Sequence, residues 1–253
     1  MRKGRMQRCI DYIRFNHESE GFQLSDDDEA DIRAVLDKDE TADSLIEKFI
    51  LENSLTNNDY VASDKDFNYY ENTRCLYNFF SIKDRDRLRE IAIYITSIRT
   101  AELMLTPIDG PFDFDRLIAT HTHLFSDIYP SAGALRTKTA AKRTEFCRPE
   151  YINSSANEIF GKLRKDHFLR GLDRESFIND LAYYMGEVEA LHPFRNGNAI
   201  TARLFFWDLV FIAGYRIDWI NIDPDRLLEA DICAIDGDYQ PLIDVLEDVV
   251  YKK

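Results

Sequence analysis

The sequence predicts a predominantly helical protein, and three observations carry this prediction. Apolar residues recur at steps of three and four along most of the chain. The alternating pattern of half-buried strands is nearly absent. The one stretch without a helical period, residues 131–152, is bounded by Gly133 and Pro149 and is typical of an irregular segment or a hairpin. We therefore expect an all-α fold with a single non-helical excursion.

Length and charge limit the classes of function. The chain has 253 residues, of which 45% are hydrophobic, enough to bury the core of one large domain or of a domain with an appendage. A net charge of -14 argues against unspecific binding to nucleic acid or to an anionic membrane. The apolar runs are short and the N-terminal segment turns acidic early, so we expect a soluble, cytoplasmic protein. The four cysteines are scattered, which does not favour a zinc site or disulfides.

Residues 1–58 are predicted to form a small helical module. Ser25 precedes three aspartates and is a typical N-cap, and a second helix follows a break at residues 39–41. The apolar faces of these two helices are expected to comprise Ile32, Val35 and Leu36, and Leu45, Ile46, Phe49 and Ile50. A linker around residues 57–66 then separates this module from a core domain at residues 67–253.

The core domain is expected to contain seven helices. They are predicted at residues 84–105, 112–129, 152–168, 174–191, 198–213, 225–235 and 241–249. His121 and His123 fall within the second of these, but their i, i+2 spacing places them on different helix faces and does not favour a metal pair. Packing or surface roles are the preferred interpretation of both.

The segment ALHPFRNGNAITARLFF, residues 190–206, indicates a functional site. Pro193 stops the preceding helix beside His192, and Gly197 permits a tight loop before the next helix. The N-terminus of that helix presents amide groups and a positive dipole end to the loop, with Asn198 at its start and Arg203 one turn further in. A base beside an anion site suggests base-assisted transfer of a phosphate-containing group.

Each feature of this segment also has an ordinary structural interpretation. A histidine after a helix is usually a surface residue or a satisfied core residue, and Gly-Asn commonly forms a turn. Their order and close spacing favour the functional interpretation.

The stretch HPFRNGNAITAR resembles the signature of the Fic family, His-Pro-Phe-x-(Asp or Glu)-Gly-Asn-Gly-Arg-x-x-Arg. Further resemblance extends over about residues 69–250, in YENTRCLYNFFSIKDRDRL, FSDIYPSAGALRT, EFCRPEYI, AGYRIDW and GDYQPLI. The resemblance implies an all-helical fold with a small β-hairpin flap. It also implies transfer of AMP from ATP to a Ser, Thr or Tyr hydroxyl of a target protein, assisted by Mg²⁺ or Mn²⁺.

The resemblance assigns roles to individual residues. By the match, His192 is the base, Gly197 and Asn198 hold the α and β phosphates through backbone and side-chain donors, and Arg203 supports the terminal phosphate. Asn78 stands where an asparagine of the family approaches the adenine.

The match also assigns the target-binding element. The flap Thr137 to Cys147 is expected to align a target protein by adding a strand to it.

Three residues depart from the signature. Asn196 replaces the carboxylate that holds magnesium, Ala199 replaces the second glycine, and Ile200 replaces the first arginine. A neutral amide lacks the charge attraction that a hard cation favours, and an apolar side chain donates nothing to phosphate. Three readings therefore remain open: a slowed AMP transferase, a Fic protein with another phosphate donor, or a degenerate nucleotide- or protein-binding module.

Upstream, NHESEG resembles the inhibitory motif of Fic proteins and of their antitoxin partners, (Ser or Thr)-x-x-x-Glu-(Gly or Asn). Asn16 departs from the first position, whereas Glu20 and Gly21 match. The resemblance implies that Glu20 pairs with Arg203 and occupies the γ-phosphate space, so that ATP binds unproductively. The competing interpretation of Glu20 is an ordinary solvated helix carboxylate.

Overall fold

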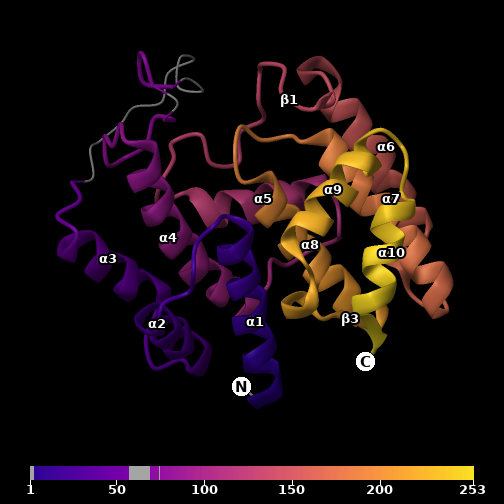
Figure 1. The fold of residues 1–253 in the computed structure, drawn as a ribbon, viewed down its shortest axis with the longest axis horizontal. Coiled ribbons are helices and arrows are strands. Elements are labelled where there is room, and N and C mark those ends of the chain that lie inside the picture. Colours follow the sequence, from indigo (N-terminus) through magenta and orange to yellow (C-terminus); the bar gives the residue numbers. More distant parts are fainter. Residues whose placement is uncertain (1–2, 57–68, 74) are drawn as a thin grey trace. The chain divides into compact units, whose positions relative to one another are not determined.

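The computed structural model describes residues 3–56, 69–73 and 75–253, and these residues are mostly helical, as expected (Figure 1). The predicted linker at residues 57–66 lies outside the described residues. The helices are α1 (Lys3–Ser19), α2 (Asp26–Asp37), α3 (Ala42–Glu52), α4 (Arg85–Leu105), α5 (Phe114–Phe125), α6 (Ile152–Lys165), α7 (Arg174–Leu191), α8 (Asn198–Ala213), α9 (Pro224–Ile235) and α10 (Gln240–Val249). The strands are β1 (Ala141–Lys142), β2 (Thr144–Glu145), β3 (Tyr215–Ile217) and β4 (Val250–Lys252), and short 3-10 helices occur at Pro149–Tyr151, His167–Leu169 and Trp219–Asn221.

The chain divides into two compact units. Unit 1 comprises Met1–Ile108 and His121–Ala134, and unit 2 comprises Asp109–Thr120 and Leu135–Lys253. This boundary differs from the predicted division at residues 58 and 67, because α4 packs against α1, α2 and α3 and so belongs with the N-terminal helices. A functional division into an inhibitory module at residues 1–58 and a core at residues 67–253 remains a prediction.

In unit 1, the predicted helix starts are confirmed. Ser25 accepts a hydrogen bond from the Asp28 amide at 3.1 Å, and Thr41 accepts one from the Ser44 amide at 3.1 Å. Each side chain satisfies one of the amides that a helix N-terminus leaves without an intrahelical partner. The apolar faces behave largely as expected. Ile32, Val35, Leu36, Leu45 and Ile46 are buried, whereas Phe49 and Ile50 are half-buried.

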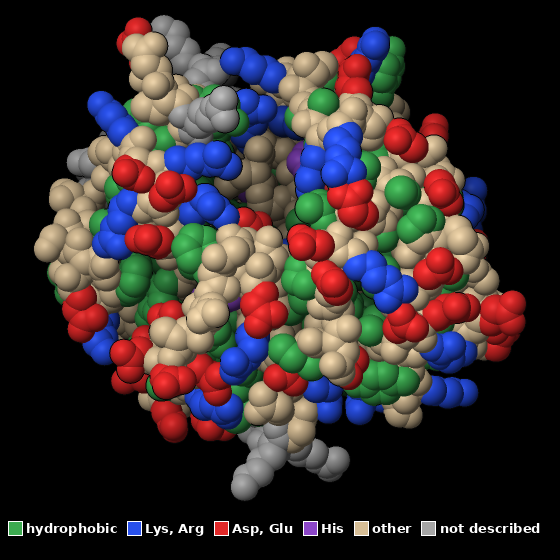
Figure 2. Space-filling model, in the orientation of Figure 1, with side chains coloured by type: hydrophobic (Ala, Val, Ile, Leu, Met, Phe, Trp, Pro, Cys, Tyr) green, Lys and Arg blue, Asp and Glu red, His purple; other side chains and the backbone are tan. Residues whose placement is uncertain are grey.

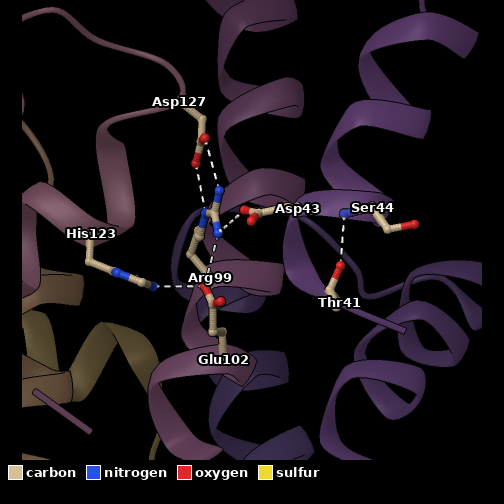
Figure 3. A network of polar contacts seen from close by, with 7 residues as sticks. All are labelled: Thr41, Asp43, Ser44, Arg99, Glu102, His123 and Asp127. Atoms are coloured by element: carbon tan, nitrogen blue, oxygen red, sulfur yellow. Dashed lines mark hydrogen bonds and ion pairs between the residues drawn. The ribbon is translucent and has the colours of Figure 1, made fainter. Parts of the chain in front are cut away.

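An ionic cluster links three segments of unit 1: α3, α4 and residues 123–127 (Figure 3). We call it the Arg99 cluster, and it consists of Arg99, Asp43, Glu102, Asp127 and His123. The Arg99 guanidinium lies 2.8 Å from Asp127, 2.8 Å from Asp43 and 2.9 Å from Glu102, and Glu102 in turn lies 2.8 Å from His123 Nε2. Burial disfavours the charged guanidinium, but its carboxylate partners more than offset this and raise the pKa of Arg99.

Unit 2 is built around α7, which is apolar on nearly every face. Its buried side chains include Phe177, Leu181, Tyr184, Val188 and Leu191, as the sequence pattern predicts, and α7 packs against α6, α8, α9 and α10. At Gly186 a Cβ atom would lie 2.8 Å from the Tyr239 ring and 2.9 Å from the Ala234 Cβ, so a glycine is required for this close packing. A core that surrounds α7 fixes the position of its C-terminus, where His192 follows.

The non-helical excursion contains the expected hairpin, with β1 and β2 antiparallel and Ala141 opposite Glu145. The antiparallel pair of β3 and β4 was not predicted, because each strand has only three residues and the two are separated by α9 and α10. The second core helix, predicted to run to residue 129, ends at Phe125. The helix predicted to end at residue 168 stops at Lys165, and a 3-10 turn follows.

The surface is charged, and none of the helices among the described residues combines the length and apolarity needed to cross a membrane. Figure 2 shows Asp and Glu side chains interspersed with Lys and Arg over the face that it draws.

Candidate functional site

The end of α7 places His192. This residue is the C-cap of α7 and adopts a left-handed conformation, with φ 42° and ψ 58°, while its amide donates to the Val188 carbonyl at 3.2 Å. A left-handed conformation is uncommon outside glycine and costs on the order of 1 kcal/mol. It persists because Pro193 cannot continue the helix and because the His192 carbonyl accepts a hydrogen bond from Arg136 Nε at 2.6 Å.

The loop after His192 is closed by one side chain. Asn198 Oδ1 accepts from the Phe194 amide at 2.9 Å, and Asn198 Nδ2 donates to the Phe194 carbonyl at 2.9 Å. Gly197, at φ 68°, is the N-cap of α8, and its carbonyl accepts from the Thr201 amide at 3.1 Å. The amides of the first turn of α8 therefore start from a fixed loop, as an anion site requires. The Asn198 amide group is engaged in holding the loop.

The imidazole of His192 stacks on Phe146. The ring centroids lie 3.7 Å apart with an interplanar angle of 9°, and Phe146 is 5% exposed. Phe146 follows β2 directly, so the predicted flap also forms one wall of the His192 site. Sequence reasoning missed this residue, because no local pattern connects two positions 46 residues apart.

One carboxylate of unit 2 lies close to His192, and three further charged groups interact with it. Glu189, one turn earlier on α7, places its Oε1 3.6 Å from His192 Nδ1. Burial opposes ionisation of Glu189, but His192 and the charges of Lys142 and Arg203 together lower the pKa of this carboxyl. Burial and the negative charge of Glu189 raise the pKa of Asp231 to about 8. We call these five residues the His192 cluster. The i, i+3 spacing of Glu189 and His192 places both on one face of the helix, so this pair could have been predicted from the sequence.

Arg136 joins the flap to the histidine loop. Its side chain is fully buried and donates to the carbonyls of His192 and Leu191, and to those of Lys138 and Cys147. The Arg136 amide also donates to the Pro193 carbonyl at 2.9 Å. Burial lowers the pKa of this guanidinium. One side chain thus holds both ends of the flap against the end of α7.

The tip of the flap is exposed and bonded to α9. Ala141 and Lys142 of β1 are exposed, which leaves a strand edge available for pairing. Arg143, at the turn, lies 2.8 Å from Glu229, and the Thr144 hydroxyl lies 2.9 Å from an Asp236 carboxylate oxygen. The hairpin is therefore attached to its unit at both its base and its tip.

The other predicted site residues divide between the two units. Arg203 is 9% exposed and lies with His192 in unit 2, whereas Asn78 and Glu20 belong to unit 1. Asn78 is buried, and its side-chain amide bonds to the carbonyls of Leu76 and Ile82 at 2.9 and 2.8 Å and to the Ile82 amide at 3.0 Å. It shapes its own loop, and an adenine contact remains a prediction.

Glu20 follows the last residue of α1. Its carboxylate lies 3.5 Å from Arg89 Nη2, and its carbonyl accepts a hydrogen bond from the same group at 2.5 Å. The Glu20 side chain is 52% exposed. Within unit 1, Glu20 therefore has a cationic partner on α4, and its pairing with Arg203 stays a prediction.

The residues at the altered signature do not form an evident metal site. Asn196 offers a neutral amide where the signature has a carboxylate. Among the described residues, no three His, Cys, Asp or Glu side chains gather as metal ligands would. The donor set thus fits a hard divalent cation poorly.

Comparison with known proteins identifies similar sequences. The Fic/DOC family model matches residues 111–209. Protein adenylyltransferase VbhT of Bartonella schoenbuchensis is 40% identical over 161 residues, which span 63% of this chain and 34% of VbhT. Two probable protein adenylyltransferases are matched over most of their length. The protein y4lH of Sinorhizobium fredii is 36% identical, and the match covers 68% of this chain and 90% of y4lH. Fic of Escherichia coli is 31% identical, and the match covers 76% of this chain and 96% of Fic.

The fold of this chain resembles solved structures. BepC of Bartonella tribocorum, crystallised with AMPPNP, has 26% sequence identity and a TM-score of 0.68, covering 76% of this chain and all of that one. An N-terminal Fic domain from Bartonella quintana with bound ADP has 27% identity and a TM-score of 0.66, covering 73% and 94%. The predicted resemblance and the helical fold with a small hairpin are confirmed by these matches.

Proposed function

This chain belongs to the Fic/DOC family, and from this premise we propose that it transfers AMP from ATP to a Ser, Thr or Tyr hydroxyl of a protein. The observation that carries the proposal is the arrangement of His192 beside the closed loop that begins α8. A neutral imidazole there can accept the hydroxyl proton, and the helix N-terminus can hold phosphate oxygens. Relatives of this chain are protein adenylyltransferases, and similar structures hold AMPPNP or ADP.

Each group of the site has a defined part in this reaction. His192 takes the proton of the attacking hydroxyl, and the amides that follow Gly197 bind the α and β phosphates. Arg203 supports the terminal phosphate. The exposed edge of the flap, residues 137–147, pairs with an extended segment of the target and brings its hydroxyl toward His192.

The altered signature slows this reaction. Ile200 supplies no charge to the phosphates, and Asn196 holds Mg²⁺ or Mn²⁺ less well than a carboxylate. Loss of one strong electrostatic contact in an enzyme site costs on the order of 3 kcal/mol in the barrier. We therefore expect a slow transferase.

A specific observation supports a second candidate function. The same three substitutions at Asn196, Ala199 and Ile200 remove charge and add a Cβ where a nucleotide must approach. We infer that such a site also suits a Fic-fold module that binds a nucleotide or a protein without transfer. It suits a Fic protein that uses another phosphate donor as well.

Intact mass spectrometry separates these candidates. The purified chain is incubated with ATP and Mg²⁺ or Mn²⁺, alone and with candidate target proteins, and the products are weighed. A mass gain of one AMP that disappears in His192→Ala supports the transferase. No gain, together with a thermal shift on ATP addition, supports the binding module. If the His192→Ala variant still gains the mass of one AMP, His192 is not the base.

We also propose that Glu20 restrains the transferase. The supporting observation is its place directly after α1, in a motif that resembles the inhibitory one, before Gly21 at φ 78°. Glu20→Gly should raise AMP incorporation, because a carboxylate no longer competes with the γ phosphate. Glu18→Gly, two residues earlier in the last turn of α1 and outside the matched positions, is the control. Equal rates and equal ATP affinity in wild type and Glu20→Gly rule out the restraint.

A further inference from the structure

The His192 imidazole has one buried nitrogen without a hydrogen bond. Among the described residues Nδ1 has no hydrogen-bond partner, although it is buried. The nearest charged acceptor is Glu189 Oε1 at 3.6 Å, and the side chains of His192 and Glu189 are 20% and 10% exposed. A buried donor left unpaired costs about 1–3 kcal/mol, so a small side-chain rotation that closes this distance to a hydrogen bond is favourable.

The surroundings keep negative charge on Glu189. Three groups besides His192 face this carboxylate electrostatically: Lys142 on the flap, Arg203 on α8 and Asp231 on α9. The cations and His192 favour an ionised Glu189, whereas Asp231 retains its proton to a higher pH than an ordinary aspartic acid. The two acids thus carry one negative charge between them near neutral pH, and that charge lies on the residue beside the imidazole.

The stacking partner restricts how the ring can turn. Phe146 lies parallel to the imidazole at 3.7 Å, so the ring keeps its plane. With Nδ1 facing Glu189, the Nε2 atom lies on the opposite side of the ring. A carboxylate that accepts from Nδ1–H fixes the tautomer in which Nε2 is the proton acceptor.

We propose that Glu189 is a positioning residue that acts through His192, by accepting a hydrogen bond from Nδ1–H and so presenting a basic Nε2 to the substrate hydroxyl. The inference rests on the proposed function. In the transfer step the hydroxyl proton moves to Nε2 and the hydroxyl oxygen bonds to the α phosphorus of ATP. The bond from that phosphorus to the bridging oxygen breaks, and pyrophosphate leaves. The imidazolium lies beside the Glu189 carboxylate, which stabilises it, and later releases its proton to water.

NMR of the full chain tests this without requiring activity. The protein is labelled with ¹⁵N-histidine, and the His192 signals are assigned by their loss in His192→Gln. We expect the Nδ1–H tautomer in the wild type. In Glu189→Gln the His192 titration midpoint should fall by ~1 pH unit or more, because an opposite charge beside an imidazole favours its protonated form. Observation of the Nε2–H tautomer in the wild type overturns the proposal.

Glu187→Gln is the matched control. Glu187 lies on the same helix two residues earlier, and its carboxylate bonds to the Tyr239 hydroxyl at 2.5 Å instead of facing His192. This variant should leave the His192 midpoint unchanged. If Glu189→Gln also leaves the His192 midpoint unchanged, the positioning role of Glu189 is rejected. If Glu189→Gln does not fold, the tautomer of His192 in the wild type tests the proposal alone.

Kinetics separate this inference from the proposed function. Glu189→Gln should lower kcat for AMP transfer ~10-fold or more and change KM for ATP little, since the effect acts on the base. Loss of transfer in His192→Ala with an unchanged midpoint in Glu189→Gln rejects only the role of Glu189. If His192→Ala retains AMP transfer, His192 is not the base. The NMR result then still reports whether Glu189 pairs with His192 Nδ1.

Discussion

The Arg99 cluster and the His192 cluster contain similar residues in different electrostatic states. In the first, Arg99 meets Asp127, Asp43 and Glu102 at 2.8 to 2.9 Å. In the second, His192 Nδ1 and Glu189 Oε1 lie 3.6 Å apart, and Asp231 has a pKa of about 8. Both are partly or fully buried, so burial alone does not explain the difference.

The difference indicates what each cluster does. Charges that meet opposite charges at hydrogen-bond distance hold segments together, as Arg99 on α4 holds α3 and the segment that follows α5 (Figure 3). A buried nitrogen without a hydrogen bond, close to an aspartic acid that keeps its proton to about pH 8, is typical of a site where protons move. Comparing the two clusters therefore separates a structural network from a chemical one.

The largest effect is expected from restoring the signature beside the His192 cluster. Asn196→Glu, Ala199→Gly and Ile200→Arg together should raise AMP transfer by ~100-fold or more, because they return charge contacts that each change such rates by about 10²–10³. The measurement is incorporation of α-labelled ATP. The same triple variant with His192→Ala serves as control, and an unchanged rate in the triple variant shows that the altered positions do not limit transfer.

A large loss of stability is expected from the Arg99 cluster. Arg99→Met should lower the free energy of unfolding by about 1.5–3 kcal/mol, because the partly buried carboxylates of Asp127 and Glu102 lose hydrogen bonds to a charged partner. Urea denaturation followed by circular dichroism measures this. Arg33→Met is the control. It removes a more exposed pair, in which Arg33 lies 2.6 Å from Glu29, and should cost under about 0.5 kcal/mol. Similar losses in the two variants contradict a clamping role for Arg99.

The His192 cluster should make stability depend on pH through Asp231. Its pKa of about 8 in the folded chain lies above the ordinary value of 3.8, so the folded state binds more protons between these values. The contribution of Asp231 to the free energy of unfolding is fully present below about pH 4 and is lost as the pH rises toward 8. Asp231→Asn should lack this slope, with a difference from wild type of at least ~1.4 kcal/mol, the value of one pKa unit. If the free energies of unfolding of wild type and variant run parallel from pH 5 to 8.5, Asp231 does not cause this pH dependence.

The smallest effect is expected at the tip of the flap. Arg143→Ala removes an exposed ion pair with Glu229 and should leave the unfolding midpoint unchanged. Amide exchange at residues 141–146 should nevertheless become faster, because the hairpin loses one attachment to α9. Hydrogen–deuterium exchange checks this against Arg226→Ala, which removes an exposed pair with Asp248 elsewhere in unit 2. Equal exchange in both variants shows that the pair does not hold the flap.

Local features of the fold were predictable from the sequence. Residues 174–191 and 198–213 form α7 and α8 with the predicted bounds, and Ser25 caps α2 as expected. Periodicity, caps and proline stops act within about one or two helical turns, so neighbouring residues contain the information. The family resemblance likewise depends on a contiguous signature around His192.

The surroundings of the site were not predictable in the same way. Phe146, Asp231 and Arg136 contact or influence the His192 loop from segments far along the chain. The boundary between the two compact units also differs from the predicted division at residues 58 and 67, because α4 packs with the N-terminal helices. These features depend on which surfaces become neighbours when the core forms.

The sequence by itself determined where α7 and α8 run, where α7 stops and which loop carries His192, Gly197 and Asn198. Only the tertiary structure decided that Phe146 stacks on the imidazole, that Asn198 closes its own loop and that Glu189 faces Nδ1 in a buried, charged setting. The physical reason is range. Backbone preferences are set by adjacent residues, whereas burial and charge at a site are set by packing between residues that the chain separates.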